Sequence, residues 1–307
     1  MNAKKYNIEF LYQPLEDKEL IKKSKLIKTQ KYTMGAITSR GTNKLRKLNQ
    51  DYSAIAAHPR NENLAFMVIA DGKSDSIKSE LASQILVEEL SSWFTRLSKT
   101  YINNPMILEP MLLGELRNLN LRLHQSNNNK GIETSFALAV KGKKETFIAN
   151  VGNCRCYTIN NDEITMQTTD DLRWYAYNSR SLITPDEVKF LIGKDFLERT
   201  IGGQDNSKRH FEPFTQIISN KNYDSLILTT HGVTDVLDST DLKKIVKDKD
   251  VEEVLDNIIY DSIYSKPKQT PEKLLNKFEK IHYKNMLIAE TVPGSCNATA
   301  IVYKKTK

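Results

Sequence analysis

Polar residues that directly follow apolar runs are the first sign of chemistry in this sequence. Asp71-Gly72 follows the run from Leu64 to Ala70, His231-Gly232 follows the run from Leu226, and Gly152-Asn153 follows the run from Thr146. Side chains at the ends of strands are held rigidly enough to form a site. Carboxylate, imidazole and thiol groups are the side chains with which proteins bind metal ions. These strand ends are therefore the candidate site.

The elements expected around these residues are strands and long helices in separate blocks. Apolar runs bounded by turn residues predict strands over 64–70, 135–140, 146–151, 154–159, 226–230 and 298–303. Helical spacing of apolar residues predicts helices over 15–27, 76–97, 106–124, 185–191, 241–259 and 271–282. Gly152-Asn153 predicts a hairpin between the strands on either side of it. This block arrangement favours an α+β layered domain.

Six short motifs follow one another over nearly the whole chain. The first, Arg-x-x-Asn-Gln-Asp, is intact from Arg46 to Asp51. The other five survive in part, as Asp71-Gly72 with Ala82-Ser83, Gly152-Asn153-Cys154-Arg155, Thr168-Thr169-Asp170-Asp171, Thr230-His231-Gly232 and Cys296-Asn297-Ala298-Thr299.

In their types and order, these six motifs resemble the type-2C protein phosphatase family. The resemblance implies a fold, a reaction and a set of site residues. The implied fold is a four-layer αββα sandwich of two stacked β-sheets flanked by helices, over residues 34–305 after an N-terminal extension of residues 1–33. The implied reaction is hydrolysis of phosphoserine and phosphothreonine by a water held between two Mg²⁺ or Mn²⁺ ions. Asp51, Asp71 and the Gly72 carbonyl match metal ligands of the family, and Arg46 matches its phosphate-binding arginine.

Three positions where the family has metal-binding aspartates carry other residues here. They are Asn153, His231 and Cys296. Each change removes a negative charge that would lie beside a divalent ion. The adjacent glycines of the family's second motif are Ser74 and Asp75 in this chain. The resemblance therefore predicts a metal site with too few carboxylates.

Three hypotheses follow within this fold. The first is a pseudophosphatase that keeps Arg46 and acts by binding a phosphoprotein or a Ser/Thr kinase, with no metal cofactor. The second is an active phosphatase with an atypical Mg²⁺ or Mn²⁺ site, helped by Asp75, Asp170, Asp171 or Asp235. In the third, Asp71, His231 and Cys296 bind Zn²⁺ instead. Lys73, if it pointed inward, would repel an ion or replace one positive charge.

Composition narrows the class of protein. The chain has 307 residues, 39% of them hydrophobic, and its net charge is +7. No apolar run approaches the roughly 20 residues of a membrane helix, and the N-terminus lacks the apolar region of a signal peptide. We therefore expect a cytoplasmic protein without a membrane partner. The lysines are spread along the sequence, so no nucleic-acid partner is expected from the charge.

Overall fold

Alternating burial along the strands explains why two sheets stack face to face. In residues 65–70, Phe66, Val68 and Ala70 point to one hydrophobic cluster, whereas Met67 and Ile69 point to another. Successive side chains of a strand point to opposite faces, so a strand that is apolar throughout must be covered on both sides.

The computed structural model describes residues 7–11, 23–42, 48–58, 61, 63–73, 78–129, 132–161, 163–172, 197–203, 212–265 and 296–306.

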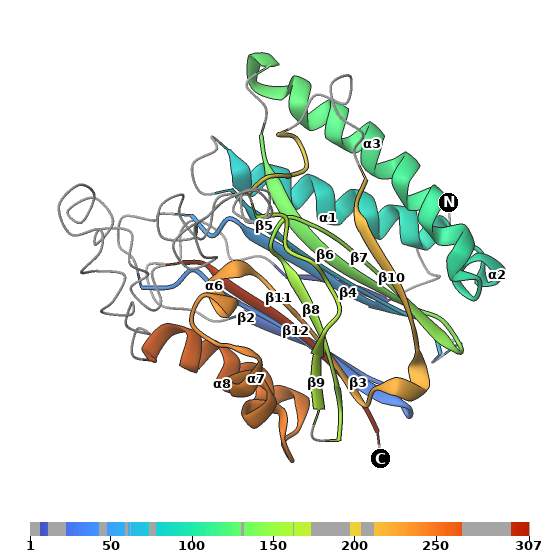
Figure 1. The fold of residues 1–307 in the computed structure, drawn as a ribbon, viewed down its shortest axis with the longest axis vertical. Coiled ribbons are helices and arrows are strands. Elements are labelled where there is room, and N and C mark those ends of the chain that lie inside the picture. The colour runs from blue at the N-terminus through green and yellow to red at the C-terminus, as the bar shows by residue number, and fades with distance from the viewer. Residues whose placement is uncertain are drawn as a thin grey trace, which may run out of the picture.

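The described strands form two six-stranded sheets whose strand pairs are antiparallel (Figure 1). Sheet A contains, in spatial order, β1 (Asn7–Leu11), β4 (Asp51–Ala57), β5 (Ala65–Gly72), β6 (Thr134–Lys141), β7 (Glu145–Val151) and β10 (Phe214–Ser219). Sheet B contains β2 (Lys23–Lys28), β3 (Tyr32–Ser39), β12 (Ala298–Lys305), β11 (Ser225–Thr229), β8 (Arg155–Asn160) and β9 (Glu163–Met166).

Helices cover the outer face of each sheet, which gives the four-layer αββα sandwich that the family resemblance implied. The helices on the side of sheet A are α1 (Ser79–Arg96), α2 (Lys99–Ile102) and α3 (Pro105–Asn129). Those on the side of sheet B are α6 (His231–Thr234), α7 (Ser239–Val246) and α8 (Val251–Tyr264). A short 3-10 turn, η2 (Asn220–Asn222), follows β10. No helix in the described part of the chain is both long enough and apolar enough to cross a membrane.

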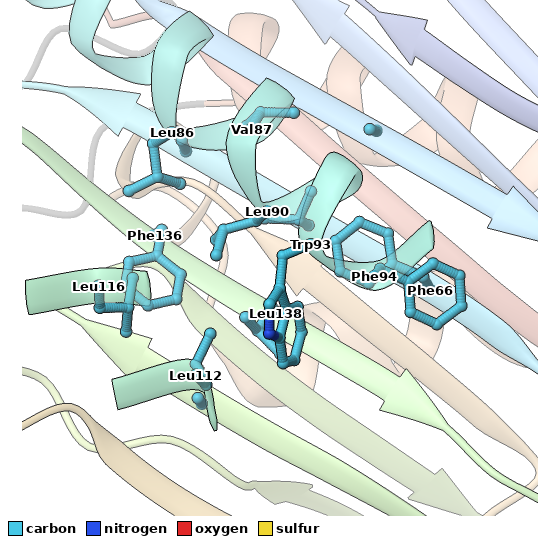
Figure 2. Packing of buried hydrophobic residues seen from close by; sticks show 14 of the residues in the cluster. Phe66, Leu86, Val87, Leu90, Trp93, Phe94, Leu112, Leu116, Phe136 and Leu138 are labelled. Atoms are coloured by element: carbon cyan, nitrogen blue, oxygen red, sulfur yellow. The ribbon is translucent and has the colours of Figure 1, made fainter. Parts of the chain in front are cut away.

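The largest core cluster lies between sheet A and helices α1 and α3 (Figure 2). Leu86, Leu90 and Trp93 lie on one face of α1 because residues three and four apart share a helix face. Phe94 stacks on Phe66 of β5 with ring centroids 4.7 Å apart. This packing holds β5, and with it Asp71, rigidly in place.

Three expectations about individual elements are wrong. The helix expected over 241–259 is two helices, α7 and α8, which are separated at residues 247–250. β7 and β8 do not form a hairpin around Gly152-Asn153, because β7 pairs with β6 and β10 whereas β8 pairs with β9 and β11. The turn carries the chain from one sheet to the other instead. The helix expected over 15–27 is also wrong for its last residues, since Lys23–Lys28 is strand β2 at the edge of sheet B. The helices expected over 185–191 and 271–282 lie outside the described residues.

Candidate functional site

Asp51 and Asp71 face each other across two neighbouring strands. Asp51 begins β4, Asp71 lies near the end of β5, and the two residues are directly paired in the antiparallel register. Asp51 is 1% exposed and Asp71 is half-buried. Burial, and then the nearby charge of Asp71, raise the pKa of Asp51 well above its ordinary value. Two carboxylates in this position require a proton or a cation between them.

Two threonines, Thr230 at the N-cap of α6 and Thr299 of β12, hold one oxygen of Asp51. Thr230 Oγ1 donates to Asp51 Oδ2 at 2.8 Å, and Thr299 Oγ1 donates to the same oxygen at 2.7 Å. Asp51 Oδ1 is buried and accepts no hydrogen bond from the described residues. Because a buried carboxylate oxygen is costly to leave unsatisfied, this atom is the one best suited to receive a cation.

His231 meets Asp71 through its backbone. The residue opens α6, directly after β11 and the N-cap Thr230. The His231 N–H donates to Asp71 Oδ2 at 3.2 Å. A hydrogen bond thus occupies an oxygen of Asp71 that the family resemblance assigns to a metal ion.

Cys296 and Asn153 lie beside the same end of the sheets. A Cβ atom on Gly232 would lie 1.9 Å from the Asn297 carbonyl oxygen and 3.1 Å from Cys296 Cβ, so these two segments are in contact. Asn153 is buried and follows Gly152, which packs against Ser135. Ser135 is the partner of Asp71 in the register of β5 and β6. The motif segments therefore converge, as the resemblance predicted.

Two acids that we expected to supplement the metal site are paired with arginines. Asp170 is 4% exposed and accepts hydrogen bonds from Arg155 Nε at 3.0 Å and Arg155 Nη2 at 2.6 Å. Asp171 forms a short ion pair with Arg199 and accepts from the Gly152 N–H at 3.0 Å. Burial raises the pKa of Asp171, and these two partners oppose that effect. No local pattern in the sequence indicated these pairings, because the arginines lie 15 and 28 positions away.

Lys73 points to an acid rather than remaining in the site as an isolated cation. Its ammonium lies 3.2 Å from Glu133 Oε2, which also accepts a hydrogen bond from Thr200 Oγ1 at 2.7 Å. Gly72 is buried, with its Cα against the backbone of Ser79. The predicted role of its carbonyl as a metal ligand stays a prediction. Arg46 and Asp75 lie outside the described residues.

The donor set that the described residues provide does not fit a two-ion centre. Among the described residues, no group of three or more His, Cys, Asp or Glu side chains is arranged to hold a metal ion. This finding contradicts the zinc hypothesis, because Asp71, His231 and Cys296 all belong to that part of the chain and do not form such a group. Asp51 and Asp71 remain as two oxygen donors that suit a single hard cation.

Solved structures agree on the fold. A bacterial serine phosphatase has a TM-score of 0.67 and 23% identity, over 89% of this chain and 97% of that one. The catalytic domain of the serine/threonine protein phosphatase PstP, in complex with two manganese ions, has a TM-score of 0.62 and 16% identity, over 90% and 99% of the two chains.

Comparison of the sequence identifies the family. The serine/threonine phosphatase stp of Listeria welshimeri is 23% identical over 216 residues, which cover 69% of this chain and 82% of that protein. The family model described as Protein phosphatase 2C matches residues 40–259, which is more than half of the chain. With the motif segments meeting at one end of the sandwich, this match shows that the chain belongs to the protein phosphatase 2C family.

Proposed function

We propose that this protein binds a phosphoserine- or phosphothreonine-containing protein, such as a Ser/Thr kinase, and that its hydrolytic activity is impaired. Its relatives are named serine/threonine phosphatases, which supports phosphoproteins as the class of partner. Arg46 is the residue that we assign to the phosphate, through a charge-assisted contact of the kind arginine makes with phosphate oxygens.

The observation that carries this proposal is the shortage of anionic side chains where the strand ends meet. His231, whose backbone N–H donates to Asp71 Oδ2, stands where a carboxylate would add a ligand and a negative charge, and its imidazole adds no negative charge. Cys296 adds no carboxylate either, and Asp170 and Asp171 are held by arginines. In-line attack on a phosphate by a metal-activated water relies on two ions held together, and these residues supply too few anionic ligands for two.

Hydrolysis of a phosphothreonine peptide with added Mn²⁺ tests the impairment. We expect no turnover above that of an Asp71→Ala variant, together with saturable binding of the same peptide that Arg46→Ala abolishes. Turnover that disappears in Asp71→Ala would refute the impairment. If the unaltered chain neither hydrolyses the peptide nor binds it, the binding role is refuted.

The alternative is an active phosphatase with an atypical metal site, and one observation favours it. Asp51 Oδ1 is buried without a hydrogen-bond donor among the described residues, opposite Asp71, which is the chemistry that a hard cation satisfies. Asp51 and Asp71 would hold such an ion, which would supply Lewis acidity at the phosphate. Calorimetric titration with Mn²⁺ distinguishes the two proposals, because the alternative requires tight stoichiometric binding that Asp51→Asn removes.

A further inference from the structure

A second cluster of charged residues lies at the end of the sandwich away from Asp71. On the paired strands β5 and β6, Ser135 lies opposite Asp71, whereas Lys141 lies opposite Ala65. About six residues of strand separate the two ends, about 20 Å at roughly 3.4 Å per residue. This far end is the one near the C-terminus in Figure 1.

Turns from several elements bring lysines together there. Lys141 Nζ and Lys31 Nζ both contact Asn63, the first at its carbonyl oxygen (3.3 Å) and the second at its side-chain oxygen (3.2 Å). Lys305 Nζ donates to the Asn220 carbonyl at 2.7 Å. We call this cluster the basic pole, and it consists of Lys31, Lys141, Lys143, Lys144, Lys221 and Lys305.

The basic pole has few counter-charges. Two acids lie directly beside its lysines: Glu145 follows Lys144 in the sequence, and Asp224 is the acid next to Lys305. Lys305 lies 3.8 Å from Asp224. Within the part of the chain that the structure describes, the other five lysines form no ion pair. A concentration of one sign of charge at one end of a protein attracts surfaces of the opposite sign.

Lys141 makes this imbalance unusual. The residue is 6% exposed, yet its ammonium donates to the carbonyl oxygens of Asn63 and Gly142, at 3.3 and 3.4 Å, and not to an acid. The ring of Tyr303 lies beneath it, with the centroid 5.9 Å away. Lysine is almost never fully buried without a charged partner. An anion arriving from outside would supply the counter-charge that the fold omits.

An exposed apolar corner adjoins the lysines. The Lys143 N–H donates to Asn103 Oδ1 at 2.8 Å, which fixes the β6–β7 turn against the link between α2 and α3. On this corner Met106 is 70% exposed and Tyr101 is 42% exposed. Basic side chains beside an exposed thioether and an exposed phenol are the combination that binds the interface of an anionic bilayer.

We propose that the basic pole binds a lipid bilayer with anionic headgroups, with Met106 and Tyr101 reaching the interface. A bilayer fits better than a nucleic acid, because the three tyrosines beneath the pole, Tyr32, Tyr223 and Tyr303, are buried and offer no platform for bases. Bound in this way, the protein would present the end of the sandwich that carries Asp71 to the aqueous side.

Co-sedimentation with vesicles tests the proposal. We expect the full chain to sediment with phosphatidylcholine vesicles that contain phosphatidylglycerol, to remain in solution with phosphatidylcholine alone, and to lose binding as salt is raised. A lysine near an anionic surface strengthens binding roughly fivefold. The double variant Lys143→Ser, Lys144→Ser should therefore bind roughly 25-fold more weakly. Met106→Ser should weaken binding at every salt concentration.

The matched control removes two positive charges from the exposed face of α3, through Arg117→Ser and Arg122→Ser. It should bind like the unaltered chain, and thermal melting of each variant checks that the fold is intact. The proposal is overturned if the chain fails to sediment with anionic vesicles, if it sediments equally with neutral ones, or if the pole and control variants bind alike. Binding to duplex DNA without binding to vesicles would also overturn it.

Discussion

Replacing Lys141 by methionine should stabilise the protein at neutral pH. Burial, together with the charges of Lys305 and Lys31, lowers the pKa of Lys141 from 10.5 to about 8. At about 1.4 kcal/mol per pH unit, keeping this side chain protonated in the folded state costs at most about 3.5 kcal/mol. Methionine keeps the apolar stem in the core and removes the charge. It leaves the Asn63 carbonyl without its donor, a loss of roughly 1 kcal/mol. We therefore expect a gain of about 2 kcal/mol.

The pH dependence of the stability difference tests whether the gain in Lys141→Met comes from removing a buried charge. Between pH 8 and 10.5 the unfolded chain holds a proton on Lys141 that the folded chain releases, so the stability of the unaltered protein rises with pH in this window. The advantage of Lys141→Met should be constant below pH 8 and should fall towards zero near pH 10. Burial raises the pKa of Tyr223 and Tyr303, which lowers stability above pH 10 in both proteins and cancels in the comparison.

Urea denaturation at pH 7 and at pH 10 measures these differences. Lys144→Met, at an exposed position of the adjacent turn, is the control and should change stability little at either pH. A destabilised Lys141→Met protein at pH 7, or a difference that is the same at both pH values, would refute the reasoning. If Lys141→Met is more stable and also binds anionic vesicles more weakly, the buried charge of Lys141 lowers stability but contributes to vesicle binding by the basic pole.

Three further predictions concern the site. Arg155→Met should destabilise the protein by about 3 to 5 kcal/mol in urea denaturation, because it leaves the carboxylate of Asp170 buried without its partner. Adding Asp170→Asn should recover part of this lost stability. If it recovers none, the loss comes from the packing of Arg155 and not from its charge. Gly232→Ala should cost more than about 2 kcal/mol by the same measurement, since its Cβ would overlap the Asn297 carbonyl, and a neutral effect would show that the two segments separate easily. His231→Asp combined with Cys296→Asp should raise the number of Mn²⁺ ions bound in calorimetry above that of the unaltered chain, and no increase would show that the surrounding loops also prevent a metal site.

The strands of the core could be predicted because each is a short apolar run bounded by turn residues. Burial on both faces also accounts for their lack of polar alternation. The predicted hairpin at Gly152 was wrong because a glycine with positive φ allows a sharp turn whether or not the flanking strands pair with each other. Only the tertiary fold decides whether the chain returns in the same sheet or crosses to the other one.

The convergence of the motif segments could also be predicted, because the family resemblance assigns each to a strand end. The arginine partners of Asp170 and Asp171 could not, since an ion pair across many residues leaves no local pattern. The basic pole was hidden for the same reason. Its lysines come from separate segments of the chain, and the sequence indicated only that lysines are spread along it.

Charge balance decides how many ions the site should hold. Two divalent cations carry four positive charges, whereas Asp51 and Asp71 offer two negative ones, and neither His231 nor Asn153 adds another. In a site where Asp51 is 1% exposed, such an excess of positive charge lacks the solvation that would stabilise it. A single divalent ion would be balanced by the two carboxylates, and in its absence one shared proton relieves their repulsion. We therefore expect a Mn²⁺ titration to end at or below one ion per chain, and saturation at two would require ligands from residues beyond those described.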